Sequence, residues 1–508
     1  MHTSISLQAT AVAAVLLALA GRQAHAQAAT APDAGALRQQ IEQAQPSVLP
    51  QARRPDAPPA PEMKPAGALQ VTVTRFEFRG NQLLDAQTLG AAVAPWLNRP
   101  VGFADLQRAV AAVGEAYRAQ GWVARAYLPQ QEVGAGTVSI QIVEAVLGRV
   151  LVDSAKDVRY PSAQALAVVQ AAQASGQPLK ATAVDRALLI LEDTPGLRAK
   201  ANLAPGQAEG QTDLLLQLES RPLWRADLGL DNTGSRSTGA WRATASAQAQ
   251  SYFGLGDLAS ANLIHTQGSD YLRAAFSLPV HPRGARAGVS VSTMDYRVVS
   301  SAFSSLGLKG HSQTLGLDGS YPVIRSTARN LYANATLDFK NYLNKSAGVT
   351  TSDYKVWVAT VGVSGSNFDE WGEGGLTSAG LTFTTGRVDL GGSPNQASDA
   401  ATTATHGGFA KLRYSASRQQ AINRLTTVTA SLTGQLASKN LESGEKFYLG
   451  GAYGVRAYPS SEAGGSAGLM LNVEARYRFQ PSWVASGFYD VGQVTVNRHN
   501  SFSGSAPK

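Results

Sequence analysis

The chain is 508 residues long, which is enough for several domains. It contains no cysteine, so disulfide bonds and thiolate metal sites are excluded. Its formal net charge is +8, but the lysines and arginines are scattered along the chain, which disfavours a concentrated nucleic-acid-binding patch.

Residues 1–26 have the pattern of a secretory signal peptide. Ala9–Ala20 is a short apolar segment, and Ala24-His25-Ala26 matches the small-residue cleavage pattern, so we predict cleavage after Ala26. No later stretch of ~18 apolar residues is available to span a bilayer as a helix. A membrane-embedded mature protein would therefore have to be a β-barrel.

One short helix is predicted over Asp33–Gln45, in the segment 27–45, because its apolar residues share one face and Asp33 can cap its start. Residues 46–69 are rich in proline. This composition predicts an extended, semi-rigid tether rather than a packed core.

A unit of about 75 residues then occurs twice, each time in the order strand, helix, helix, strand, strand. The elements of the first copy are predicted at Val71–Arg79, Ala86–Leu97, Phe103–Arg118, Val123–Leu128 and Thr137–Val143. Those of the second copy are predicted at Gly148–Val152, Ser162–Gln173, Ala183–Leu191, Leu197–Leu203 and Asp213–Leu218. We therefore predict two α+β domains, residues 70–146 and 147–220.

Beyond the second domain the helical periodicity disappears and apolar and polar residues alternate. The clearest cases are Trp241–Gln250, Leu331–Phe339 and Leu471–Phe479. Segments of about ten alternating residues between turns are typical of a transmembrane barrel. In these segments the polar, even-numbered face would line a wet lumen and the apolar, odd-numbered face would meet lipid. We predict an all-β transmembrane barrel over residues 221–508. A soluble β-sandwich or solenoid is the alternative, but it would use shorter strands.

No arrangement of residues indicates catalysis, a metal site or a cofactor, so we predict that the chain is not an enzyme. The seven histidines are scattered and form no H-E-x-x-H motif. Gly464–Gly468 matches the G-x-S-x-G pattern, but a loop precedes it and a strand follows it. A true nucleophile elbow joins a strand to a helix.

Two motifs within the predicted barrel carry opposite charges. Their residues are Val455, Arg456 and Tyr458 in a glycine-rich loop, and Phe488, Asp490 and Gly492 on one face of the strand Trp483–Val496. A charge in a confined lumen needs a partner, so we predict that Arg456 binds Asp490. The alternative is that each charge is separately solvated.

These two motifs resemble those of the outer-membrane transporters of two-partner secretion. That family comprises the haemolysin and filamentous-haemagglutinin secretion/activation proteins, within the barrel-assembly superfamily. Val455–Tyr458 resembles the family's V-R-G-Y loop motif, with Ala457 in place of glycine, and Phe488–Gly492 resembles its F-x-D-x-G strand motif. The resemblance covers nearly the whole chain from Asp33 onward.

The repeated unit is similar to the polypeptide-transport-associated (POTRA) domain. Phe76–Asn81 and Leu188–Gly206, which contains Asp193-Thr194-Pro195-Gly196, look like signatures of the family. The N-terminal helix and tether resemble the family's pore-plugging helix and linker.

The resemblance implies a pore in the bacterial outer membrane, with its POTRA domains in the periplasm, that exports one large partner exoprotein to the cell surface. The residues of the two barrel motifs would lock the loop inside the barrel. An extended client would dock on the edge strand formed by Val123, Ala124, Arg125, Ala126, Tyr127 and Leu128. Outer-membrane lipid is the other expected partner, and nucleic acid is not one. An insertase of the same superfamily and a passive porin are the alternative functions.

The end of the chain departs from the family pattern. We count about thirteen barrel strands, whereas the resemblance implies further strands after Phe488–Gly492 and an aromatic C-terminus. We therefore expect a barrel that lacks its last strands. Its two unpaired strand edges would be costly in lipid, so these residues alone should not form a competent transporter.

Overall fold

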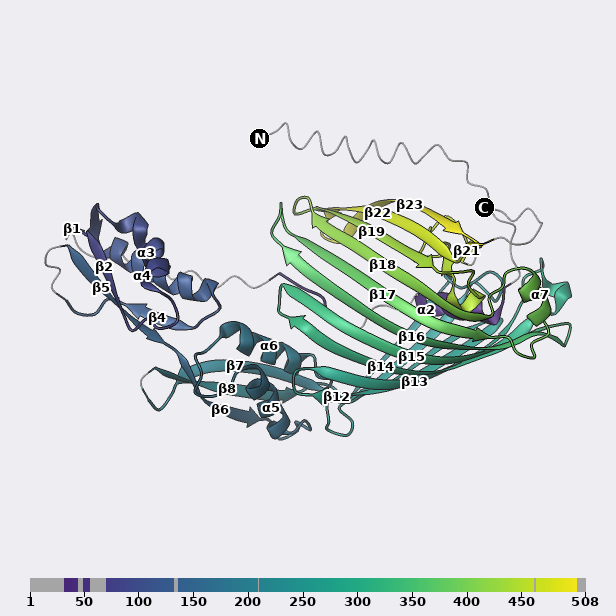
Figure 1. Ribbon diagram of the computed structural model, residues 1–508, viewed down its shortest axis with the longest axis horizontal. Helices are drawn as coiled ribbons and strands as arrows, with labels where there is room; N and C mark the ends of the chain where they lie inside the picture. Colours follow the sequence, from purple (N-terminus) through teal and green to yellow (C-terminus); the bar gives the residue numbers. More distant parts are fainter. Residues whose placement is uncertain are drawn as a thin grey trace, which may run out of the picture.

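The computed structural model describes residues 32–43, 49–54, 70–131, 136–208, 210–460 and 463–499. These residues form two small α+β domains followed by a large antiparallel sheet that curves around a lumen (Figure 1). The predicted signal peptide and most of the tether lie outside the described residues. In the part of the chain that is described, no helix has both the length and the hydropathy needed to cross a bilayer.

The first domain packs two helices against a three-stranded sheet. Its elements are β1 (Gln70–Thr72), β2 (Arg75–Arg79), α3 (Ala86–Val93), η1 (Ala94–Trp96), β3 (Pro100–Gly102), α4 (Phe103–Ala119), β4 (Ala124–Tyr127) and β5 (Thr137–Glu144). β5 lies in the centre, parallel to β2 and antiparallel to β4, so β4 is an edge strand. Val113, Tyr117 and Ile140 are fully buried between α4 and the sheet.

Two elements of this domain differ from the prediction. The segment predicted as one strand, residues 71–79, forms two, because β1 pairs with β3 whereas β2 pairs with β5. The predicted helix over residues 86–97 ends its α-helical part at Val93. Pro95, which has no N–H group to donate, lies in the 3-10 turn that follows.

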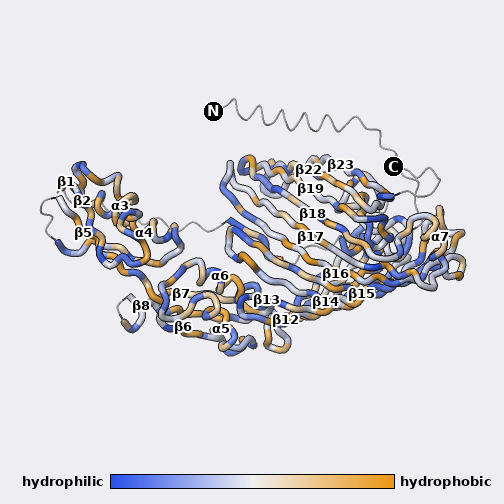
Figure 2. Tube along the Cα trace, viewed as in Figure 1, coloured by the Kyte–Doolittle hydropathy of each residue, from blue (hydrophilic) through white to orange (hydrophobic). Residues whose placement is uncertain are grey.

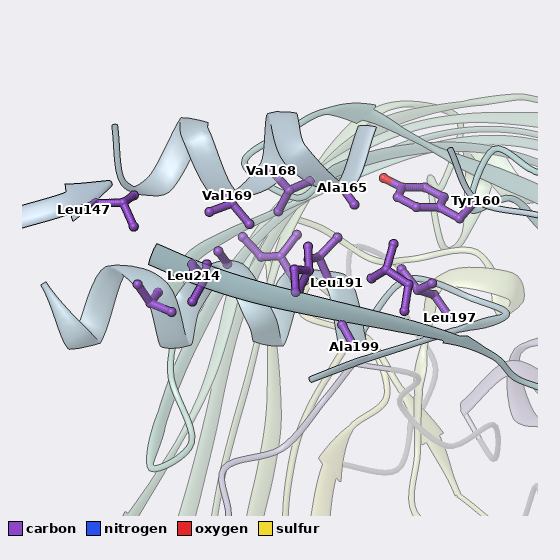
Figure 3. Close-up of a cluster of buried hydrophobic side chains, with 14 of the residues drawn as sticks. Leu147, Tyr160, Ala165, Val168, Val169, Leu191, Leu197, Ala199 and Leu214 are labelled. Atoms are coloured by element: carbon purple, nitrogen blue, oxygen red, sulfur yellow. The ribbon is translucent and has the colours of Figure 1, made fainter. Parts of the chain in front are cut away.

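The second domain repeats the topology of the first. Its elements are β6 (Val146–Ser154), α5 (Ser162–Ala172), α6 (Ala181–Glu192), β7 (Leu197–Pro205) and β8 (Gln211–Ser220). β8 is central, parallel to β6 and antiparallel to β7. Figure 3 shows the core between helices and sheet, where Leu147, Val169, Leu191 and Leu214 converge and are almost completely buried.

A thirteen-stranded antiparallel sheet follows, counted over the described residues, and agrees with the predicted number. Its strands are β9 (Trp224–Asp231), β10 (Arg242–Gln250), β11 (Leu258–Thr266), β12 (Ser269–His281), β13 (Ala285–Arg297), β14 (Lys309–Arg325), β15 (Arg329–Ser346), β16 (Val349–Asp369), β17 (Gly375–Asp389), β18 (Gly407–Ala421), β19 (Thr426–Ala437), β22 (Ala467–Gln480) and β23 (Trp483–Thr495). Each strand pairs with its neighbour in this order, and β9 and β23 are the two edges. The short helices η2 (Ser304–Leu306) and α7 (Gln396–Ala401) lie in connections at the end away from the two domains (Figure 1).

Side chains alternate between the lumen and the outer surface along these strands, and Figure 2 shows hydrophobic and hydrophilic residues alternating in the same way. On β15, Lys340 and Tyr342 point into the lumen and are buried. Leu337, on the opposite face of the same strand, is 48% exposed on the outer surface. This is the predicted pattern of even-numbered lumen positions and odd-numbered lipid positions.

Large aromatic side chains mark the end of the sheet nearest the two domains. Trp224 begins β9, Phe253 lies in the β10–β11 turn, Trp371 in the β16–β17 turn, and Trp483 begins β23; all four are strongly exposed. Exposed aromatic rings at one level are typical of a membrane–water interface. The periplasmic membrane boundary therefore passes through these turns.

The alternation predicts how the sheet responds to a new charge. Leu337 lies at the middle of β15, so Leu337→Arg should place a cation deep in lipid and cost about 2–4 kcal/mol. The matched change Thr336→Arg, one residue away, projects into a lumen cavity of about 420 Å³ and should be tolerated. The measurement is the fraction of heat-modifiable barrel in outer-membrane extracts. Equal loss in both variants would contradict the assignment of the two faces.

Candidate functional site

The connection between β19 and β22, residues 438–466, folds back into the lumen; we call it the inward loop. Its short elements are η3 (Ser443–Glu445), β20 (Phe447–Tyr448) and β21 (Gly464–Gly465). Phe447, Leu449 and Val455 pack against Met470 of β22 in a small apolar cluster. This cluster holds the glycine-rich part of the loop, which carries the first predicted motif, against the barrel wall.

The structure brings Arg456 and Asp490 together. The Arg456 Nε and Nη2 atoms each donate to a different oxygen of the Asp490 carboxylate, both at 2.8 Å. The Arg456 backbone N–H also donates to Asp490, at 3.1 Å. Such a bidentate arginine–carboxylate pair fixes the orientation of the guanidinium as well as its distance from the carboxylate. The Asp490 carboxylate raises the pKa of Arg456, so the guanidinium stays charged.

The other residues of the two motifs each have a distinct place. The Phe488 ring lies 3.7 Å from the Arg456 guanidinium carbon, in cation–π geometry. A Cβ atom at Gly492 would lie 2.6 Å from the end of the Leu449 side chain, so a larger residue there would force Leu449 of the loop to shift. Val455 is buried in the apolar cluster, whereas the Tyr458 side chain is exposed and only its backbone joins the loop turn.

Two further residues at this contact lie on β22 and were missed by the motif search. Arg456 Nη1 donates to Glu474 at 2.5 Å, and Asn472 Nδ2 donates to Asp490 at 2.9 Å. Both positions belong to the even-numbered face that the alternation assigned to the lumen. The alternation shows which face of a strand a residue occupies, but not which residue of the neighbouring strand lies opposite it. Glu474 and Asn472 therefore could not be named as partners of Arg456 and Asp490.

Helix α2 (Ala34–Gln43) lies inside the curve of the sheet (Figure 1). Asp33 caps its first turn through the Ala36 N–H and accepts a hydrogen bond from Ser443 Oγ at 2.7 Å. The Ala34 N–H donates to Asn344 Oδ1 of β15 at 2.9 Å. The start of α2 is thus bound to both the inward loop and the barrel wall.

Gly35 of α2 packs closely against Ser443 and Gly444 of the inward loop. A Cβ atom at Gly35 would lie 2.5 Å from Ser443 Oγ and 2.6 Å from the Gly444 nitrogen. The second contact is backbone, which cannot move aside as the end of a flexible side chain can. Further along the helix, Arg38 pairs with Glu42 at 2.7 Å and donates to Tyr342 Oη.

The inward loop beneath α2 is fixed to the wall by buried charges. Glu445 receives hydrogen bonds from Lys340 of β15 at 2.7 Å and from Lys411 of β18 at 2.6 Å. Burial alone would raise the pKa of Glu445, but the two ammonium groups outweigh it and lower that pKa. Burial and the nearby Asp33 carboxylate raise the pKa of Glu442 to about 7.

The predicted client-binding strand is β4, at one edge of the first domain's sheet. Val123 lies before β4, and its N–H donates to Leu179 O of the second domain at 3.0 Å. The edge therefore begins at Ala124. Along it, Arg125 and Tyr127 are exposed, with the guanidinium carbon 5.7 Å from the ring centroid.

The signature Asp193-Thr194-Pro195-Gly196 lies where the second domain meets the barrel. Asp193 receives two hydrogen bonds from Arg325, at the end of β14, at 2.6 and 2.8 Å. The Gly196 N–H donates to Gln250 Oε1, at the end of β10, at 3.1 Å. The sequence could not indicate these contacts, because Asp193 and Arg325 are 132 positions apart and Gly196 and Gln250 are 54 positions apart.

Comparison with known proteins identifies the family. The haemolysin secretion/activation protein family ShlB/FhaC/HecB matches residues 210–506, and the ShlB-type POTRA domain matches residues 71–145. The heme/hemopexin transporter protein HuxB of Haemophilus influenzae is 25% identical over 492 residues, covering 93% of this chain and 85% of that protein. The outer membrane transporter CdiB of Dickeya dadantii is 24% identical over 454 residues, covering 85% and 76%.

Solved structures agree on the fold. CdiB from Escherichia coli superposes with a TM-score of 0.65 at 20% identity, over 88% of this chain and 83% of that one. CdiB from Acinetobacter baumannii gives 0.59 at 17% identity, over 93% and 87%. Because the family match spans more than half of the sequence, this chain belongs to the haemolysin secretion/activation protein family ShlB/FhaC/HecB, a family of two-partner-secretion transporters of the bacterial outer membrane.

Proposed function

We propose that this chain captures one large partner protein in the periplasm and exports it, in extended form, through the lumen to the cell surface. The observation that carries the proposal is the position of α2, a ten-residue helix from the start of the chain that fills part of the lumen. Membership of a transporter family supports export over barrel insertion or passive diffusion.

Helix α2 is suited to be a removable plug. It contributes no strand to the sheet, so its departure would leave every hydrogen bond between strands in place. A helix of ten residues is marginal by itself in water, so its order depends on the seat made by Asn344, Ser443 and Gly444. Loss of that seat would free the helix without unfolding the barrel.

The inward loop would remain when the plug leaves. It is anchored to β22 and β23 through Arg456 and to β15 and β18 through Glu445, and neither anchor includes a residue of α2. We assign Arg456, Asp490 and their neighbours the role of a lock that keeps the loop folded along the wall. The client would pass beside the loop.

Capture would use the edge of β4. An edge strand presents unpaired backbone groups that an extended segment can join as an additional strand. Client folding outside the cell would then draw the remainder of the chain outward.

The lock predicts a non-additive mutant series. Arg456→Ala should remove about 2 kcal/mol of loop anchoring, below the cost of breaking a fully buried ion pair, because the guanidinium is partly exposed. Export should fall strongly while the amount of heat-modifiable barrel stays near normal. Asp490→Asn should have a similar effect, and the double variant should be little worse than either single variant.

Arg476→Ala is the matched control for the lock. Arg476 contacts Glu474, and its own side chain is 66% exposed. Export should therefore stay close to normal in this variant. Additive losses in the Arg456 and Asp490 pair, measured as secreted client, would show that the two groups do not act together.

The plug predicts that extra volume at one glycine opens the pore. Gly35→Leu would collide with the Gly444 backbone and should raise the open fraction about tenfold in planar bilayers, as expected for an overpacked contact. Gln43→Leu on the same helix is the control, because Gln43 is exposed. A closed pore in the Gly35 variant would contradict the seat described above.

The capture site predicts a position-specific cross-link. Because the chain has no cysteine, Tyr127→Cys introduces a unique thiol on the β4 edge. With a short bifunctional thiol reagent it should form an adduct with a stalled client that carries cysteine. Arg75→Cys, on the opposite edge strand β2, is also exposed and should give little adduct. Equal adduct from both edges would argue against docking on β4.

A further inference from the structure

Two segments of different function meet at the β14–β15 turn, residues 326–328. From one side the second domain docks on it through Asp193 and Arg325. From the lumen side the tether lies against it: the Arg53 N–H donates to Thr327 O at 2.8 Å. The tether is the segment that connects the plug helix to the first domain.

One guanidinium group joins the two sides. Arg325 uses Nε and Nη2 for the Asp193 carboxylate, and its side chain is only 7% exposed. Its third nitrogen, Nη1, donates to Ser326 O at 3.2 Å and to Asn330 Oδ1 at 3.1 Å. The Ser326 N–H also donates to Asn330 Oδ1. The arginine therefore holds the turn closed from within while it binds the second domain.

The tether has a second anchor beside the same turn. The Ala52 N–H donates to Ser366 Oγ of β16 at 2.8 Å, and Ser366 is the cross-strand partner of Asn330. Leu49, Pro50 and Gln51 line a cavity of about 350 Å³ together with Asn330 and neighbouring lumen residues. Asn330 therefore lies between the arginine that binds the second domain and the wall that binds the tether.

We propose that the β14–β15 turn couples docking of the second domain to retention of the plug tether, with Arg325 as the positioning residue. While Asp193 holds Arg325, the turn keeps the shape that binds Arg53. When a client bound to the periplasmic domains draws the second domain away, the guanidinium loses its partner and the turn relaxes. The tether is then released, and the plug helix can follow it. This inference rests on the proposed function of α2 as a removable plug.

The rest of the docking surface is separate from the tether. Gln250 receives the Gly196 N–H at the β10–β11 end of the sheet, and Arg186 donates to Pro322 O earlier on β14. Neither contact includes Arg53 or Ala52. A variant that weakens domain docking elsewhere can therefore be distinguished from one that disturbs the β14–β15 turn.

The test measures the open fraction of the purified full-length chain in planar bilayers without client, so plug release is read separately from export. Arg325→Ala and Asp193→Asn should each raise the open fraction about fivefold or more, the range of ordinary coupling between sites. Ser366→Ala, which removes only the tether contact, should also raise it. Combining Ser366→Ala with Arg325→Ala should give less than the product of the two effects.

Two variants make the test specific. Arg329→Ala is the matched control, because Arg329 lies beside the same turn but its side chain binds Asn367 on the outer face. It should leave the pore closed, as should Gln250→Ala, which weakens docking away from the turn. Opening by Gln250→Ala equal to that by Arg325→Ala would overturn the inference in favour of general undocking. A closed pore in Asp193→Asn, whose change lies outside the barrel, would overturn it outright.

The proposed function would fail differently. If deletion of residues 33–54 leaves the pore closed, α2 is not the plug, and the coupling has nothing to release. If that deletion opens the pore but Arg325→Ala and Asp193→Asn do not, only the coupling is rejected.

Discussion

A backbone N–H or C=O group in lipid has no water to bind, so it must bond to a neighbouring strand. The antiparallel pairing from β9 to β23 meets this constraint everywhere except along the outer edges of these two strands, and it forces successive side chains to opposite faces. One face meets lipid, and the other faces a lumen wider than the strand side chains fill. Charges such as Lys340 and Lys411 are thereby turned inward, where they need partners. The inward loop supplies the partner of both lysines, Glu445.

The two occupants of the lumen are held in different ways. The loop is bound by ion pairs to four strands, through Arg456 on one side and Glu445 on the other. The plug helix is bound by hydrogen bonds at its start, by close glycine packing and by the buried side chains of Leu37 and Arg38. The loop is thus tied to the wall by charges, whereas the helix is held by packing and by hydrogen bonds.

The sequence allowed the architecture to be predicted because period-two alternation and the repeated unit are local signals. It also allowed the Arg456–Asp490 pair to be predicted, since both lie in short motifs on an identifiable face. β16 is not among the clearly alternating segments, because Val356 and Val358 face the lumen beside α2 while Trp357 faces outward, so both faces are apolar there. The Asp193–Arg325 contact joins residues 132 positions apart and leaves no local pattern.

Small side chains make up much of the lining of two lumen cavities on β15–β19. Along the cavities on β15–β19 these include Thr336, Thr360, Ser364, Gly380, Thr382, Ser415, Ser417, Ser431 and Thr433. Short hydroxyls can exchange hydrogen bonds with any peptide backbone but form no deep pocket for a particular side chain. A chain sliding over such a wall meets many weak, equivalent contacts rather than a few strong ones, which is the condition for fast passage through a pore. The wall would thus let a client chain pass easily whatever its sequence. Selection of the client would then depend on the periplasmic domains.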